Sequence, residues 1–199
     1  MPELLVDFIT SLEGCASAEG WPGWWGLEGP EYLTWLADQP ERSYTLVMGA
    51  NTYRVMYGFV EANPTGSGEL DAGEADAMAE LTGAPKLVFS STLAGPLPWA
   101  NSELVSGDAI EAMRALKRDG PAPMRTIGSV SLCRSLLQAG LVDRFRVVVF
   151  PVITGVTGRE RIYEGYPDVA LDLIDSRTFD GRTQLLEYRP RLLDGPPGT

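Results

Sequence analysis

Apolar and polar positions along this chain follow two periods, one typical of strands and one typical of helices. Continuous apolar runs that end in glycine, serine or threonine predict buried strands at 4–10, 44–49, 86–89, 124–127 and 143–155. Between them, stretches with apolar residues three or four positions apart predict helices at 30–39, 50–60, 69–81, 108–120 and after Gly128. Strand and helix therefore alternate over the first three quarters of the chain.

The last quarter has a different pattern. Residues 169–192 alternate apolar and polar positions, and Asp180-Gly181 is typical of a tight turn between antiparallel strands. A further short strand is expected within 102–108. We therefore predict an α/β fold of three layers, α/β/α, with a mixed, mostly parallel central sheet closed by a C-terminal antiparallel hairpin. We expect one domain over residues 1–190 and a frayed tail at 191–199.

A segment rich in glycine and tryptophan, 11–32, separates the first strand from the first helix. A loop of this length inside a compact domain is usually functional, and we expect a lid or a pocket wall. Three of its side chains, Trp21, Trp24 and Trp25, could stack on a planar substrate ring. A structural loop pinned by buried tryptophans is the alternative.

Composition narrows the chemistry that the chain can perform. It has no histidine, which removes Ser-His-Asp and Cys-His nucleophile systems and most zinc sites, so no metal site is expected. The formal charge of −11 argues against nucleic acid as a partner. We see neither a membrane-spanning run nor a secretory signal, and expect a cytoplasmic protein with reduced thiols at Cys15 and Cys133.

Three predicted strands end in small or hydroxyl residues, in "MGANTY", "FSST" and "IGSVS". The carboxyl ends of parallel strands share one edge of a sheet, and open α/β sheets bind their ligands there. The first and last of these ends lead into helices, whose free backbone N–H groups attract phosphate or carboxylate. Together the three ends favour a nucleotide-type ligand. The alternative for the last one is a tight turn in which Ser131 caps the helix.

The order of these segments resembles the dihydrofolate reductase-like superfamily, most closely the stand-alone relatives of the reductase domain of bifunctional riboflavin-biosynthesis deaminase/reductases. The matching segments lie within 4–190 and are "ITSLEG", "VMGANTY", "LVFSSTL" and "IGSVSLCRSLLQAGLVDRFRVVVFPVITG". The resemblance implies a homodimeric reductase that uses NADPH to transfer hydride to a small planar nitrogen heterocycle, such as a pyrimidine- or pteridine-like substrate. The zinc signature of the deaminase half is absent from this sequence.

The resemblance also implies roles for individual residues. The residues along the cofactor phosphates would be Gly49, Ala50, Asn51 and Thr52, those flanking the adenosine ribose Ser90, Ser91 and Thr92, and those holding the pyrophosphate Gly128, Ser129, Val130 and Ser131. Glu13 would be catalytic, orienting a substrate nitrogen or helping to deliver a proton through water. The alternative for Glu13 is a turn acid bound to its own backbone. Glu28 and Glu31 are weaker candidates, because acidic residues favour helix starts in any case.

Two departures from the family pattern concern the cofactor. Family members often carry arginine at the position of Ala50, where it can pair with the 2′-phosphate, and a basic residue at that of Ser91. Arg54 and Lys86 are the basic residues that could substitute. Where family members usually have Gly-Gly, this chain has Gly128-Ser129. The side chain of Ser129 leaves a ligand less room to approach the backbone. NADH and a reduced deazaflavin or flavin therefore stay open as cofactors.

The sequence leaves three functions open. The first is the reductase, favoured by Glu13 and the tryptophan-rich segment. The second is a non-catalytic nucleotide- or pterin-binding protein on the same fold, favoured by Ala50 and by Ser129 in place of a second glycine. The third is a structural dimer subunit that pairs through the apolar strand at 145–153 and the closing hairpin.

Overall fold

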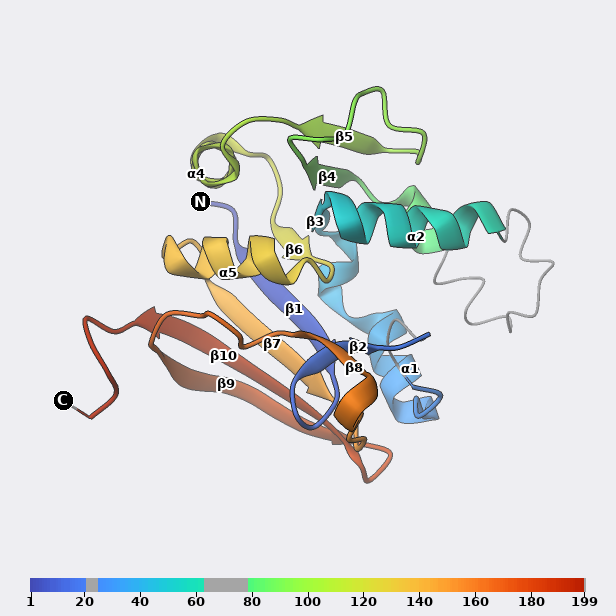
Figure 1. The fold of residues 1–199 in the computed structure, drawn as a ribbon, viewed down its shortest axis with the longest axis vertical. Helices are drawn as coiled ribbons and strands as arrows, with labels where there is room; N and C mark the ends of the chain where they lie inside the picture. The colour runs from blue at the N-terminus through green and yellow to red at the C-terminus, as the bar shows by residue number, and fades with distance from the viewer. Residues whose placement is uncertain (21–24, 63–78, 199) are drawn as a thin grey trace.

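The computed structural model describes residues 1–20, 25–62 and 79–198. Its main feature is one eight-stranded sheet with the order β5-β4-β3-β6-β1-β7-β10-β9 (Figure 1). The six parallel strands are β1 (Leu4–Thr10), β3 (Thr45–Gly49), β4 (Lys86–Phe89), β5 (Ser102–Val105), β6 (Met124–Thr126) and β7 (Arg144–Val149). The antiparallel hairpin is β9 (Val169–Phe179) and β10 (Thr183–Leu192). The predicted sheet is confirmed. The expected dimer contact through the apolar strand at 145–153 is wrong, because β7 is hydrogen-bonded on both edges, to β1 and to β10.

Helices cover both faces of this sheet. α4 (Ala109–Asp119) and α5 (Val130–Gln138) cover one face, and α1 (Pro30–Asp38) and α2 (Ala50–Ala62) cover the other. The alternation of strand side chains places neighbouring residues in different layers: Val147 packs with the α5 cluster, and Val148 packs with Tyr32 of α1. The three-layer α/β/α prediction is confirmed.

Part of the glycine-rich segment is a strand. β2 (Cys15–Ala18) pairs antiparallel with β8 (Gly158–Arg161), which follows the short 3-10 helix η2 (Gly155–Thr157). The expectation of one continuous loop over 11–32 is therefore wrong at this point. The sequence of β2, "CASA", has no apolar period, and its pairing partner lies far away in the chain. Cys15 and Cys133 are both free and buried, as expected.

Two sequence predictions fall mainly outside the described residues. Trp21 and Trp24 are not among them, so their predicted stacking on a substrate stays untested. Of the predicted helix at 69–81, only the last residues are described, and they are helical as far as residue 83.

The turn between β9 and β10 fixes the start of α1. The predicted turn is confirmed at Asp180 and Gly181, which have φ of +51° and +67°. The Asp180 carboxylate accepts hydrogen bonds from the backbone N–H groups of Glu31 (3.1 Å) and Tyr32 (3.2 Å). In return, the Glu31 carboxylate accepts one from the backbone N–H of Asp180 at 2.5 Å. This is the reciprocal pattern of a capping box, built between segments far apart in sequence.

Candidate functional site

Two helix starts lie side by side at the carboxyl edge of the sheet. β3 ends at Gly49 and α2 begins at the next residue, while β6 ends at Thr126 and α5 begins at Val130. Because β3 and β6 are neighbouring parallel strands, the amino ends of α2 and α5 meet at this edge. Each helix start presents backbone N–H groups that have no partner within the helix.

The Ser129 hydroxyl ties these two helix starts together. Its oxygen accepts a hydrogen bond from the backbone N–H of Gly49 at 2.8 Å. It also lies 2.9 Å from the Thr52 hydroxyl and 3.1 Å from the carbonyl oxygen of Ile127. The prediction that "MGANTY" and "IGSVS" meet at one edge is therefore confirmed by direct contact. We call Gly49, Thr52, Gly128 and Ser129 the Ser129 bridge.

The backbone of this turn is left-handed at two consecutive residues, Gly128 (φ +49°) and Ser129 (φ +65°). A Cβ added to Gly128 would lie 3.2 Å from the Thr52 hydroxyl, so only glycine fits there without displacing a neighbour. Ser129 takes the N-cap position of α5, yet its side chain makes no capping hydrogen bond. The alternative with Ser131 as the cap is wrong, because α5 already begins at Val130.

This arrangement fits an anion such as a diphosphate. Helix amino ends carry partial positive charge, and left-handed backbone at the turn lets a ligand approach closely. Ala50 and Asn51 form the first turn of α2, and Val130 and Ser131 that of α5. These four residues thus occupy the positions expected of them at the edge.

The third strand end lies on the far side of β3. After β4, the Ser90 hydroxyl accepts hydrogen bonds from the backbone N–H groups of Thr92 and Leu93, both at 3.0 Å. The Arg54 guanidinium of α2 reaches the Thr92 hydroxyl at 3.5 Å. Ser91 is exposed on the same turn. This turn therefore forms a second polar group at the edge, next to the Ser129 bridge.

Lys86 belongs to a different part of the molecule. It begins β4, at the amino end of the strand, and its ammonium donates to the carbonyl oxygens of Leu81 (2.7 Å), Thr82 (3.0 Å) and Ala84 (2.6 Å). Burial lowers the pKa of Lys86 to about 8. The idea that Lys86 could pair with a cofactor phosphate is therefore wrong, since its charge is held at the opposite edge.

Glu13 lies in the loop after β1, where its carboxylate holds the loop after β7. One oxygen accepts hydrogen bonds from the backbone N–H (2.6 Å) and hydroxyl (2.5 Å) of Thr154 and from the backbone N–H of Gly155 (3.1 Å). Burial would raise the pKa of Glu13, but hydrogen bonding to the side chains of Thr154 and Ser11 and to the backbone of Glu13 and Thr154 lowers it to about 2. The second oxygen is buried without a partner among the described residues. An ionised Glu13 can only accept hydrogen bonds and has no proton to donate.

Trp25 packs into an aromatic cluster below α1. Its ring centroid lies 5.9 Å from that of Phe150, which in turn lies 5.3 Å from Tyr32. The cluster continues through Phe179 to Trp35. Trp25 is therefore half-buried against the core, and its indole N–H is buried without a partner among the described residues. Its predicted stacking on a substrate stays a prediction.

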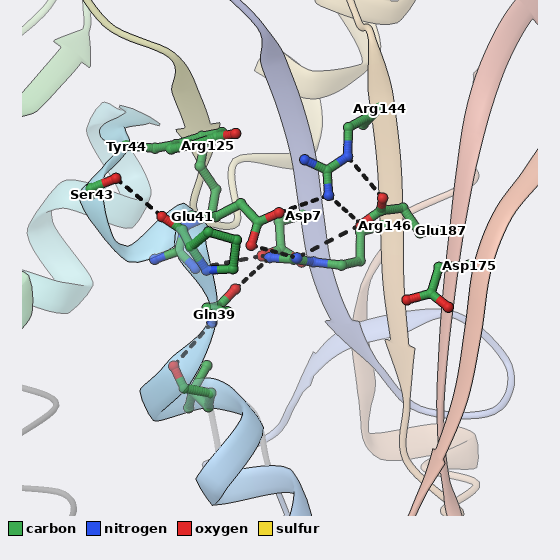
Figure 2. A network of polar contacts seen from close by, with 12 residues as sticks. Asp7, Gln39, Glu41, Ser43, Tyr44, Arg125, Arg144, Arg146, Asp175 and Glu187 are labelled. Carbon is green, nitrogen blue, oxygen red and sulfur yellow. Dashed lines mark hydrogen bonds and ion pairs between the residues drawn. The ribbon is translucent and has the colours of Figure 1, made fainter.

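Sequence reasoning missed a buried ion network on the α1 face of the sheet (Figure 2). Arg146 binds Asp7 at 2.6 Å and the side-chain oxygen of Gln39 at 2.7 Å. Arg144 binds three carboxylates, those of Glu3 (2.8 Å), Glu41 (2.7 Å) and Glu187 (2.7 Å). The visible signal was two arginines within an apolar strand, which only a buried set of carboxylates can accommodate.

The ion network is buried and its charges are paired with one another. Arg146 is only 2 % exposed. Burial would raise the pKa of Asp7, but attraction and hydrogen bonding to Arg146 lower it overall. A cavity of about 340 Å³ is lined by network residues, including Arg144, Arg146 and Glu187, together with Trp35, Asp175 and Arg177. Because the guanidiniums of Arg144 and Arg146 are already matched by carboxylates, they offer little to a charged ligand.

Two further observations limit the chemistry. Within residues 1–20, 25–62 and 79–198, no three His, Cys, Asp or Glu side chains are grouped so that they could hold a metal ion. In the same part of the chain, every helix is too short or too polar to cross a membrane. A second cavity, of about 560 Å³, lies beside Lys86 and Trp99 and contains none of the predicted site residues.

The sheet order, the closing hairpin and the paired helix starts define an α/β domain with the dihydrofolate reductase-like fold. The RibD C-terminal domain family matches residues 2–185, and the chain belongs to this family. A search of curated proteins found no match.

Solved structures show the same fold. A candidate riboflavin-biosynthesis protein from Shewanella sp. PV-4 superposes with a TM-score of 0.71 at 19% identity, covering 95% of this chain and 99% of its own. A pyrimidine reductase-like protein from Corynebacterium diphtheriae gives 0.62 at 18% identity, covering 96% and 92%. Dihydrofolate reductase from Enterococcus faecalis, solved with NADP(H), gives 0.57 at 14% identity, covering 94% and 96%.

Proposed function

We propose that the protein is a reductase that uses NADPH to transfer hydride to a small planar nitrogen heterocycle of the pyrimidine or pteridine type. The observation that carries the proposal is the Ser129 bridge, in which the Ser129 oxygen accepts from Gly49 N–H at 2.8 Å and joins two helix starts. Membership of the RibD C-terminal domain family supports the reductase class. The dihydrofolate reductase neighbour, solved with NADP(H), supports the choice of cofactor.

The residues at the edge have separate tasks in this proposal. The first-turn N–H groups of α2 and α5 would hold the cofactor diphosphate, and Gly128 would let it approach the backbone. When bound, NADPH supplies the hydride for the reduction. The protein itself would bind the cofactor and the substrate, and would hold the substrate ring in a fixed orientation.

The reacting end of the site lies toward β1 and β7. Glu13 follows β1, and as an anion it would accept a hydrogen bond from a ring N–H and so fix the orientation of the substrate. Its pKa of about 2 means that it stays ionised at neutral pH. Because the chain has no histidine, the proton that completes the reduction would come from water.

The test is to titrate the protein with NADPH, NADH and a reduced deazaflavin, using tryptophan fluorescence to monitor binding. We expect saturable binding of NADPH, weakened at least ~10-fold in Gly128→Val because the side chain would meet Thr52. Gly181→Val is the matched control, since Gly181 also has a positive φ but nothing lies within 4 Å of an added Cβ. If none of the three cofactors binds, the proposal is wrong.

The competing function is a non-catalytic nucleotide- or pterin-binding protein. Glu13→Ala separates the two, because it removes the substrate contact and leaves the Ser129 bridge intact. Loss of NADPH oxidation with unchanged NADPH affinity supports the reductase. Binding of a pyrimidine or pteridine together with NADPH, with no turnover in the unmodified protein, supports the competing function.

We also propose that the protein forms a homodimer through β9. This strand ends the sheet, spans eleven residues and exposes Leu171 (43%), Leu173 (59%) and Ile174 (45%). Exposed edge strands of this kind tend to pair with another chain. Sedimentation of the unmodified protein as a monomer would exclude this dimer, and Leu173→Lys is expected to shift a dimer toward the monomer.

A further inference from the structure

The cavity beside Lys86 and Trp99 lies at the amino edge of the sheet, opposite the Ser129 bridge. Its volume of about 560 Å³ falls within the range of small-molecule sites, about 300–1,000 Å³. It borders the amino ends of β3, β4 and β5 and the last turn of α4. Apolar side chains form much of its wall, among them Leu87, Leu97, Leu116 and Met124. The body of a ligand that fits this cavity is therefore apolar.

The side-chain N–H groups of the cavity wall already have acceptors. The Lys86 ammonium donates to three backbone carbonyl oxygens, at 2.7, 3.0 and 2.6 Å. The Trp99 indole donates to the Thr82 hydroxyl at 3.2 Å. The Asn101 amide donates to the carbonyl oxygens of Thr82 (3.4 Å) and Gly83 (3.0 Å). Among the described residues that line the cavity, no other has a side-chain N–H group, so an anionic ligand would find no such donor available.

Two oxygen-bearing side chains of the wall remain available to a ligand. Glu103 is exposed and forms no ion pair with any residue that the structure describes. It lies opposite Leu87 in the pairing of β4 with β5, and Leu87 packs against the core beneath α4, so Glu103 lies on the α4 face of the sheet. The Ser102 hydroxyl is buried and has no hydrogen-bond partner among the described residues. Both side chains can accept a hydrogen bond.

The end of α4 adds negative potential on the same face. Leu116, in the last turn of this helix, and Gly120, its C-cap, both line the cavity. The carbonyl end of a helix carries partial negative charge and attracts cations. The two basic residues of this turn, Lys117 and Arg118, are both ion-paired with carboxylates. The polar groups that the cavity offers therefore favour a cation over an anion.

We propose that this cavity is a second ligand site, which binds a small amine with an apolar body and one protonated amino group. The apolar wall holds the body of the ligand, the ammonium group pairs with the Glu103 carboxylate, and Ser102 supplies a second acceptor. The cavity lies at the amino ends of β3 and β4, whereas the predicted cofactor residues follow their carboxyl ends. The inference thus goes beyond the proposed function and does not depend on it.

The experiment measures the binding of phenethylamine by isothermal titration calorimetry, with and without NADPH. The comparison ligand is 3-phenylpropanoate, which has a similar size and the opposite charge. We expect phenethylamine to bind at least ~10-fold more tightly, because Glu103 attracts one charge and repels the other. Glu103→Gln is expected to weaken phenethylamine binding ~3- to 5-fold, as befits an exposed ion pair. Glu164→Gln is the matched control, since Glu164 is also exposed and does not line the cavity.

Each outcome decides for or against the site. Saturable binding of phenethylamine that persists with NADPH present and is weakened by Glu103→Gln alone supports the inference. No saturable binding overturns it, and so does equal binding of the two probes, because the cavity then does not select an amine. Equal weakening in Glu103→Gln and Glu164→Gln also overturns it, since the amine would respond only to the net charge of −11. Competition with NADPH would place the amine at the carboxyl edge instead. All these results can be obtained whether or not the protein is a reductase.

Discussion

Two polar groups on the same sheet differ in a way that helps to locate the site. The ion network around Arg144 and Arg146 is strongly charged, buried and internally matched. The Ser129 bridge carries no formal charge, and the helix start beside it has no side-chain cap. If the site were located by the number of charged residues alone, the ion network would be the stronger candidate. Donors without partners at the carboxyl edge are the better indication of a ligand site, because an anion can satisfy them.

The largest expected effect is at the network, where Arg146→Met removes the main partner of the buried Asp7 and leaves only Arg125, at 3.7 Å. Removing one member of a buried ion pair costs about 3–5 kcal/mol, so we expect a loss of that size in the free energy of unfolding. The measurement is urea denaturation, with Arg177→Met as the control, since Arg177 forms an exposed pair with Asp175. The control is expected to cost less than about 1 kcal/mol.

If Arg146→Met lowers the free energy of unfolding no more than Arg177→Met does, the network does not stabilise the fold. Should Arg146→Met fail to fold, Arg146→Lys tests the same pair with the charge retained. In any folded variant of the network, NADPH affinity is expected to match the unmodified protein, because the network lies away from the Ser129 bridge.

The intermediate effect is at the bridge itself. Ser129→Ala removes the acceptor of the Gly49 N–H; an unsatisfied buried donor costs about 1–3 kcal/mol, and because Gly49 is half-buried we expect a loss at the lower end of this range. NADPH binding is expected to weaken severalfold as well, because α2 and α5 are no longer tied together. Ser135→Ala is the matched control, since the Ser135 hydroxyl only donates to the carbonyl of Ser131 within α5. Equal NADPH affinities in the two variants would argue against a role for the bridge in binding.

The smallest effect concerns pH and Glu13. Its folded-state pKa of about 2 lies below the ordinary value of 4.5, so ionised Glu13 stabilises the folded protein above about pH 4.5. This stabilisation is lost as the pH falls from 4.5 toward 2. The difference in unfolding free energy between the unmodified protein and Glu13→Gln should therefore be constant near neutral pH and shrink in acid. A difference that grows in acid would mean that the carboxyl is protonated in its contact with Thr154.

The sequence predicted those features whose cause is local. Strand ends could be recognised because glycine and hydroxyl residues mark them directly, and Asp180-Gly181 because a tight turn needs residues that tolerate positive φ. The hydroxyl of Ser129 was assigned correctly to the edge, but its bond to Gly49 depends on β3 and β6 being neighbours. Neither segment alone indicates that these two strands are neighbours in the sheet.

Features built from distant segments could not be predicted. The partners of Arg144 come from Glu3, Glu41 and Glu187, which lie on three separate elements or segments. The cap of α1 comes from Asp180, at the other end of the chain. β2 is too short, and its small residues give too weak a strand pattern, to be recognised without its partner β8.

The position of β1 in the sheet has a consequence for the order in which the protein can assemble during synthesis. Its neighbours are β6 and β7, so β1 has no partner in the sheet until residues 124–149 have been synthesised. Contacts between such distant segments make folding slow, because a long loop must close before they form. β1, which lies inside the finished sheet, therefore keeps both edges unpaired while residues 11–123 are synthesised.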